Sequence, residues 1–118
     1  MANSNNAIAI VLLVLTAGGS TAEAHALLDH ASPDVGSTVS TSPDSVTLYF
    51  TDALDPKSSG AEVRNSNGDK VDGGSSASGN TLHASVKNLS PGSYTVKWHV
   101  LSADTHKSQG SFSFRVGP

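Results

Sequence analysis

The stretch LSPGSYTVKWHV, residues 89–100, carries two features that decide the fold. Its second half alternates apolar with polar residues, the period-two pattern of a strand with one buried face, at Tyr94, Val96, Trp98 and Val100. The Pro91-Gly92 turn followed by Tyr94 is typical of the corner at which a tyrosine hydroxyl ties a turn to the backbone in β-sandwiches. Trp98 is then expected to anchor the core.

Other short segments show the same alternation and are separated by Gly, Pro, Ser and Asn clusters. They are SVTLYFTD (45–52), NTLHASVKNL (80–89) and GSFSFRV (110–116), with weaker candidates at ALLDHASP (26–33) and GAEVRN (60–65). Asn67-Gly68 predicts a tight hairpin turn, and VDGGSSASGN (71–80) is interpreted as a flexible loop. With no helical periodicity, about seven strands predict an all-β fold, a two-sheet antiparallel sandwich of the Ig-like or cupredoxin-like barrel type.

The N-terminal segment has the pattern of a secretory signal peptide over residues 1–24. Its apolar run, residues 7–15, is too short to cross a bilayer, which takes roughly 20 residues, and Ala22-Glu23-Ala24 fits an A-x-A cleavage site. The leader MANSNN has no Lys or Arg, so a retained membrane anchor is the alternative. Cleavage would leave residues 25–118 as one small domain with a single core.

The charge and sulfur content exclude several classes. Ten acidic residues stand against seven Lys and Arg with no basic block, so neither nucleic acid nor an anionic membrane surface is indicated. There is no Cys, and the only Met is Met1. Any metal site in the processed chain would therefore be built from nitrogen and oxygen donors.

Cleavage after Ala24 would make His25 the first residue. Its α-amine and an imidazole nitrogen could then close a chelate ring on one metal ion without help from the fold. These groups have ordinary pKa values of about 7.7–8.0 and 6.5, so a metal must displace protons near neutral pH. Copper(II) binds nitrogen sites most strongly of the common divalent ions and accepts a flat N/O ligand set.

Asp104-Thr105-His106 supplies a second candidate element, an Asp-x-His motif. In an extended chain residues two apart point to the same side, so the carboxylate and the imidazole could converge. The carboxylate could bind the metal directly, or it could orient the imidazole by a hydrogen bond. With His25, the motif would complete three nitrogens and one oxygen, a tetragonal copper(II) set.

These residues resemble the CopC copper-resistance proteins of the bacterial periplasm. The resemblance covers nearly the whole chain after residue 24 and is most specific in two blocks, LSPGSYTVKW (89–98) and SADTHKSQGSFSFRV (102–116). It implies a small Greek-key β-sandwich that holds one copper(II) per chain through His25, Asp104 and His106. An acidic residue used by some members corresponds to Asp52, as an axial or water-mediated contact. The copper(I) site that other members build from a Met-rich loop is not expected, because no Met follows Met1.

The resemblance implies a periplasmic copper(II) carrier or buffer in copper homeostasis or resistance, without catalysis. The expected form is a monomer, not inserted in the membrane after processing, with a membrane copper importer of the CopD type as a candidate partner. Of the other histidines, His83 is expected to face solvent and His30 could approach the site. His99 could support a ligand of the site or face solvent, and exposure is favoured. Two alternatives stay open: a secreted copper-dependent oxygenase, which would also use an N-terminal histidine, and a metal-free sandwich that binds a protein partner.

Overall fold

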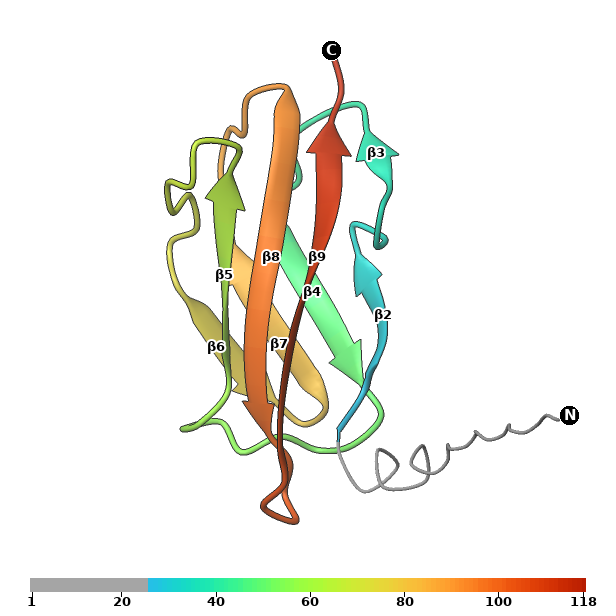
Figure 1. Cartoon of the computed structure of the whole chain (residues 1–118), viewed down its shortest axis with the longest axis vertical. Helices are drawn as coiled ribbons and strands as arrows, with labels where there is room; N and C mark the ends of the chain where they lie inside the picture. Colours follow the sequence, from blue (N-terminus) through green and yellow to red (C-terminus); the bar gives the residue numbers. More distant parts are fainter. Residues whose placement is uncertain (1–25) are drawn as a thin grey trace, which may run out of the picture.

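The computed structural model describes residues 26–118, which form a sandwich of two four-stranded sheets (Figure 1). The predicted signal peptide and His25 lie outside the described residues. In chain order the strands are β2 (Leu28–Ser32), β3 (Thr38–Val39), β4 (Ser45–Phe50), β5 (Gly60–Asn65), β6 (Ser75–Ser78), β7 (Thr81–Ser85), β8 (Gly92–Leu101) and β9 (Lys107–Val116). Residues 26–118 contain no helix that could span a membrane.

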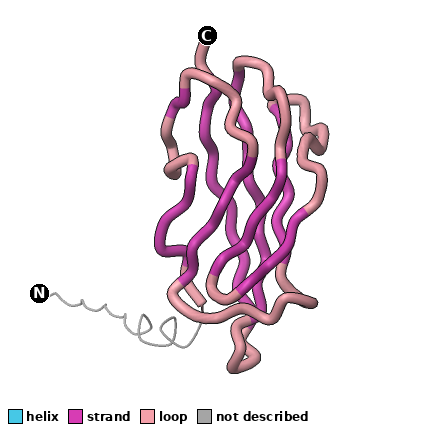
Figure 2. Tube along the Cα trace, turned by 180° about the vertical axis from the view of Figure 1, so that it is seen from behind, coloured by secondary structure: helices cyan, strands magenta, loops and turns pink. Residues whose placement is uncertain are grey.

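One sheet has the strand order β2-β4-β7-β6 and the other β3-β9-β8-β5. Neighbouring strands run antiparallel, except that β3 runs parallel to β9. Hairpins join β6 to β7 and β8 to β9, and the other connections between these strands cross from one sheet to the other. Figure 2 shows the strands and the loops that join them from behind. The predicted all-β sandwich is confirmed, with eight strands in the described part of the chain.

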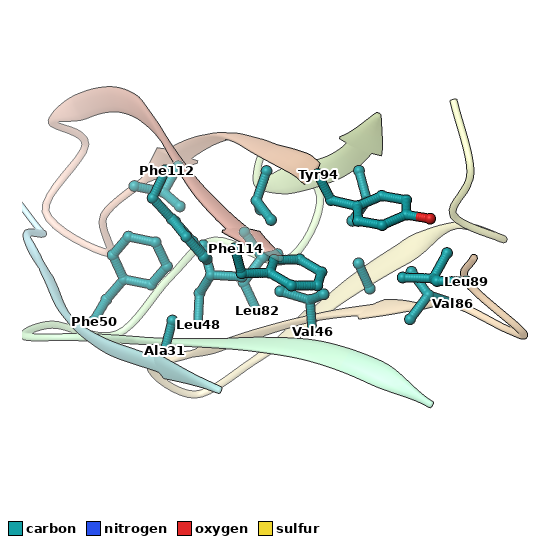
Figure 3. Packing of buried hydrophobic residues seen from close by; sticks show 14 of the residues in the cluster. Ala31, Val46, Leu48, Phe50, Leu82, Val86, Leu89, Tyr94, Phe112 and Phe114 are labelled. Carbon is teal, nitrogen blue, oxygen red and sulfur yellow. The ribbon is translucent and has the colours of Figure 1, made fainter. Parts of the chain in front are cut away.

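The alternating apolar residues fill the space between the sheets (Figure 3). Every second residue of β4 is buried, and so is every second residue along the latter half of β9. These side chains are Val46, Leu48, Phe50, Phe112, Phe114 and Val116. Burial of each such side chain contributes about 1.5–3 kcal/mol, and a one-residue slip would turn the whole set to solvent, so the alternation fixes the strand register.

The tyrosine corner is present as predicted. The hydroxyl of Tyr94 donates a hydrogen bond to the carbonyl oxygen of Ser90 at 2.5 Å, and the Tyr94 ring stacks on Phe114 with ring centroids 5.6 Å apart. This corner lies at the start of β8, at the end of the sandwich where the chain terminates (Figure 1).

Trp98 faces the core but does not occupy its centre. It is partly buried and packs edge-on against Phe50, with centroids 5.1 Å apart and planes at 72°. Gly110 of β9 leaves room for the indole, because a Cβ there would lie 2.6 Å from a ring carbon. The prediction that Trp98 anchors the core is therefore met only in part: Trp98 packs against the core at its border, whereas Phe50 and Phe114, each 1% exposed, occupy the centre.

The interpretation of residues 71–80 as a flexible loop is also wrong in part. Ser75–Ser78 forms β6, an edge strand paired with β7. Within Ser75–Ser78 there is no alternating apolar pattern, because Ala77 is its one apolar residue and packs against the core. Backbone pairing with β7 therefore forms a strand that side-chain patterning could not indicate.

Asp72 covers the free edge of β5 in the opposite sheet. Its fully buried side chain accepts hydrogen bonds from the backbone N–H of Val63 at 2.7 Å and of Gly74 at 2.9 Å, and it lies 3.0 Å from the amine of Lys70. Desolvation by burial opposes ionisation, but these three partners together hold the pKa of Asp72 below its ordinary 3.8. We call these contacts of Asp72 the clasp. The clasp occupies the N–H of Val63, an edge group of β5 that would otherwise be open to pairing with another chain.

Candidate metal centre

Three segments meet at the end of the sandwich opposite the tyrosine corner. They are the start of β2, the loop after β4 and the turn between β8 and β9, all at the lower end of Figure 1. Backbone hydrogen bonds join them: Thr51 N–H donates to Leu27 O at 2.9 Å, and Ala103 N–H donates to Ala53 O at 2.9 Å. Segments far apart in the sequence are thus held together where the Asp-x-His motif lies.

The first described residues are firmly attached to this end. Ala26 is fully buried, and its carbonyl oxygen accepts a hydrogen bond from the hydroxyl of Ser108 at 2.8 Å. The N–H of Leu27 donates to the hydroxyl of Thr51 at 2.9 Å. Ala26 is therefore fixed beside Ser108, near the start of β9, and Ser108 follows His106 by two residues.

Asp104 and His106 lie on a turn, not on extended chain as predicted. Thr105 between them has φ of 72°, a left-handed conformation that is costly for a β-branched residue. The turn is closed by hydrogen bonds from Thr105 N–H to Ser102 O and from Ser102 N–H to His106 O, both 2.8 Å. The predicted convergence of the two side chains is nevertheless present, by way of this turn.

The two side chains contact each other. His106 Nδ1 lies 3.2 Å from Asp104 Oδ1, with the side chains 46% and 53% exposed respectively. The hydroxyl of Ser102 also donates to Asp104 Oδ1, and this bond, followed by the one from His106, holds the pKa of Asp104 below 3.8. A histidine held at Nδ1 by a carboxylate presents its other ring nitrogen, Nε2, as a metal donor.

Ser102 is a member of this centre that the sequence analysis missed. It is 1% exposed and continues the core-facing series of β8, two residues after Val100. A serine at a position where the alternation calls for an apolar residue is unusual, because a buried hydroxyl needs a partner. That break in the pattern was the available signal.

Asp52 lies in the loop after β4, at the same end of the sandwich, but it does not join the Asp104–His106 pair. It follows β4 directly, and its Oδ1 accepts a hydrogen bond from the N–H of Ala53 at 3.0 Å. Among residues 26–118, no three histidine or acidic side chains stand close enough to hold a metal ion. The structure thus brings Asp104 and His106 together but does not add Asp52 to them as a third ligand.

The remaining histidines serve other contacts. His30 stacks on Tyr49 with centroids 4.3 Å apart and its Nδ1 lies 2.8 Å from Asp29, whereas His83 lies 3.4 Å from the Thr47 hydroxyl. His99 lies over Gly60, and its ring would be 3.1 Å from a Cβ there. His83 and His99 are exposed, as predicted.

Comparison with known proteins agrees with this description. A family model of the CopC domain matches residues 28–117. The chain belongs to the CopC family. Copper resistance protein C of Xanthomonas campestris pv. juglandis is 35% identical over 93% of this chain and 94% of its own. Protein YobA of Escherichia coli is 30% identical over 98% and 99% respectively.

Solved structures of CopC proteins show the same sandwich. CopC from Methylosinus trichosporium OB3b has a TM-score of 0.75 and 34% identity, covering 80% of this chain and 95% of that chain. PcoC, a methionine-rich copper resistance protein from Escherichia coli, has a TM-score of 0.65 and 26% identity over 78% and 98%. Membership of this family gives the chain a copper-related function.

Proposed function

We propose that the protein is a periplasmic copper(II) carrier or buffer that binds one ion per chain through His25, Asp104 and His106. The observation that carries the proposal is the attachment of Ala26 to Ser108 at 2.8 Å. His25 is joined to Ala26 by a peptide bond, so its Cα is about 3.8 Å from that of Ala26. Its amine and imidazole are therefore within reach of the Asp104–His106 pair.

The donor chemistry supports the oxidised ion. The amine and imidazole of His25 with Nε2 of His106 offer three nitrogens, and the carboxylate of Asp104 supplies oxygen. Nε2 points away from the Asp104 contact, so Asp104 orients His106 while that contact to Nδ1 persists, and a direct bond from its carboxylate to the ion requires the contact to open. Such an N/O set suits tetragonal copper(II), whereas copper(I) prefers sulfur ligands. The chain has no Cys and no Met after Met1, so it differs in this respect from methionine-rich PcoC.

Asp52 takes a secondary part in the proposal. Ala53 and Ala103 are joined by a backbone hydrogen bond. Asp52 precedes Ala53 and Asp104 follows Ala103, so both carboxylates belong to residues next to this bond. We assign Asp52 a water-mediated or axial role, and we expect its replacement to change affinity less than replacement of Asp104.

The proposal includes secretion and no catalysis. Cleavage after Ala24 would deliver residues 25–118 to the periplasm as a monomer and create the amine that the site needs. A membrane importer of the CopD type would be the receiving partner. Of the six aromatic side chains that an oxygenase could use on a substrate, four pack inside the sandwich, namely Phe50, Tyr94, Phe112 and Phe114; Trp98 and Tyr49 are partly buried.

The test uses the secreted protein, its intact mass and a copper(II) titration followed through fluorescence of Trp98, the single tryptophan. The mass should correspond to a chain that starts at His25, and quenching should end at one equivalent. A glycine inserted before His25 should abolish tight binding, whereas a glycine added after Pro118 should not. Affinity should fall from pH 8 to pH 5 as protons compete for the nitrogens. Unchanged affinity with the blocked terminus would refute the proposal.

A further inference from the structure

We infer that Ser102 is the positioning residue of the copper site, an inference that rests on the proposed function. Among the described residues it is the polar residue that is buried as a whole, backbone and side chain together, at 1% exposure. A buried hydroxyl without a partner destabilises the fold, so its hydrogen bonds are the reason a serine is tolerated there.

The hydroxyl of Ser102 has three hydrogen-bond contacts in the turn, and the carbonyl oxygen of His106, at 3.2 Å, is the more distant of its two acceptors. The hydroxyl donates its single hydrogen to Asp104 Oδ1, and it accepts from the N–H of His106 at 3.2 Å. One buried oxygen thus connects the side chain of one proposed ligand to the backbone of the other. The bond to an ionised carboxylate is of the charge-assisted, stronger kind.

These bonds oppose the strain of the turn. Thr105, with φ of 72°, adopts a left-handed conformation that is unfavourable for a β-branched residue. Backbone bonds of Ser102 to Thr105 and His106 close the turn, and the hydroxyl adds the contact that orients Asp104 within it. Without the hydroxyl, the turn keeps its backbone bonds but Asp104 loses the group that fixes its carboxylate.

The consequence for metal binding is preorganisation of His106. Asp104 Oδ1, held by Ser102, lies 3.2 Å from Nδ1 of His106 and so favours the tautomer with the proton on Nδ1, in which Nε2 is unprotonated and can act as the donor to copper. Ser102 touches no metal in this account. It acts through Asp104, and its contribution is complete before copper arrives.

The test compares Ser102→Ala with Ser102→Thr, which keeps a hydroxyl, and with Ser42→Ala as matched control. Ser42 also uses its hydroxyl in a hydrogen bond, accepting from Leu89 N–H at 2.8 Å, but it precedes β4 at the other end of the sandwich. Ser102→Ala should weaken copper(II) binding about 10–100-fold, Ser102→Thr should restore much of it, and Ser42→Ala should not change it.

A second readout needs no copper. In metal-free wild-type protein, ¹H–¹⁵N spectra of the imidazoles should show His106 protonated on Nδ1, and Ser102→Ala should shift it toward the Nε2-protonated form. An Nε2-protonated His106 in the wild type, or a folded Ser102→Ala with wild-type affinity, would overturn the inference even though copper binds. Failure of the wild type to bind copper would instead refute the proposed function, and the tautomer would still test Ser102.

Discussion

Asp72 and Asp104 are two carboxylates whose pKa values are both lowered, in opposite settings. Asp72 is fully buried at the edge of β5, where two backbone N–H groups and Lys70 surround it. Asp104 is 53% exposed on the β8–β9 turn, where a serine hydroxyl and an imidazole hold it. The carboxylate of Asp72 stabilises the fold, whereas the carboxylate of Asp104 is still accessible to a further binding partner.

The comparison shows that a lowered pKa does not by itself mark a functional site. Hydrogen bonds lower the pKa in both cases, although burial opposes them most strongly at Asp72. What separates the two residues is access and the identity of the partner. Lys70 can only donate hydrogen bonds, whereas His106 has a ring nitrogen that can bind a metal.

The partner of Asp104 gives the largest expected effect. Replacing His106 by Ala removes one nitrogen donor and should weaken copper(II) binding by about 100-fold or more, which is about 2.7 kcal/mol. Titration of the secreted protein with a competing chelator measures this loss. His83→Ala, which removes an exposed histidine of β7, is the control. Equal losses in both variants would show that the histidines act without a defined site.

Replacing each of the two carboxylates in turn tests the roles assigned to them, and Asp104 comes first. Asp104→Ala should lower copper(II) affinity about 10–100-fold and lower the melting temperature less than Asp72→Ala does, because its side chain is exposed and the Ser102 hydroxyl keeps the carbonyl oxygen of His106 as an acceptor. Chelator competition and thermal unfolding of the metal-free protein measure the two quantities. A lowered melting temperature with normal affinity would reverse the roles assigned to the two residues.

Asp72→Ala should show the opposite behaviour. It leaves the N–H of Val63 without its acceptor and should lower the free energy of unfolding by about 1–3 kcal/mol, with copper affinity unchanged. Urea titrations of the metal-free protein measure this. Asp29→Ala removes an exposed carboxylate paired with His30 and should cost less than about 1 kcal/mol. A stability equal to wild type in Asp72→Ala would mean that the clasp contributes nothing.

Acid provides the smallest and most graded test. A carboxyl whose folded-state pKa is depressed stabilises the fold above the unfolded-state value of about 3.9, and this is lost as pH falls through the lower folded-state pKa. The free energy of unfolding of the metal-free protein should therefore decline below about pH 4. The decline should be shallower in Asp72→Asn. If the free energy of unfolding of Asp72→Asn fell with pH as steeply as that of the wild type, Asp72 would be excluded as the cause of the decline.

The fold was predictable wherever one face of a strand meets the core. The alternation in β4 and β9 and the tyrosine corner at Tyr94 each indicated the observed structure. β6 was missed because a serine-rich edge strand is formed by backbone pairing with β7, which leaves no apolar period. Trp98 packs against the core as expected, but its position at the border, over Gly110, was not foreseen, because that cross-strand relation is not revealed by a single strand.

The site was predictable in its residue types but not in its geometry. The Asp-x-His spacing indicated that Asp104 and His106 converge, and they do, yet through a left-handed Thr105 that extended-chain reasoning does not produce. Ser102 escaped because its role depends on a turn that closes four residues later. The roles of His25 and Asp52 remain predictions, and His25 lies outside the described residues.

The central claim is that one copper(II) ion is bound by nitrogens of His25 and His106. The most direct measurement is electron paramagnetic resonance of the one-equivalent copper(II) complex, prepared with all histidine nitrogens labelled with ¹⁵N. The amine of an N-terminal His25 carries the label as well, so coupling from three nitrogens should change entirely from the ¹⁴N to the ¹⁵N pattern. A directly bound ¹⁴N nitrogen in the labelled complex would contradict the account, because it would place copper on a backbone amide or on an amine other than that of His25.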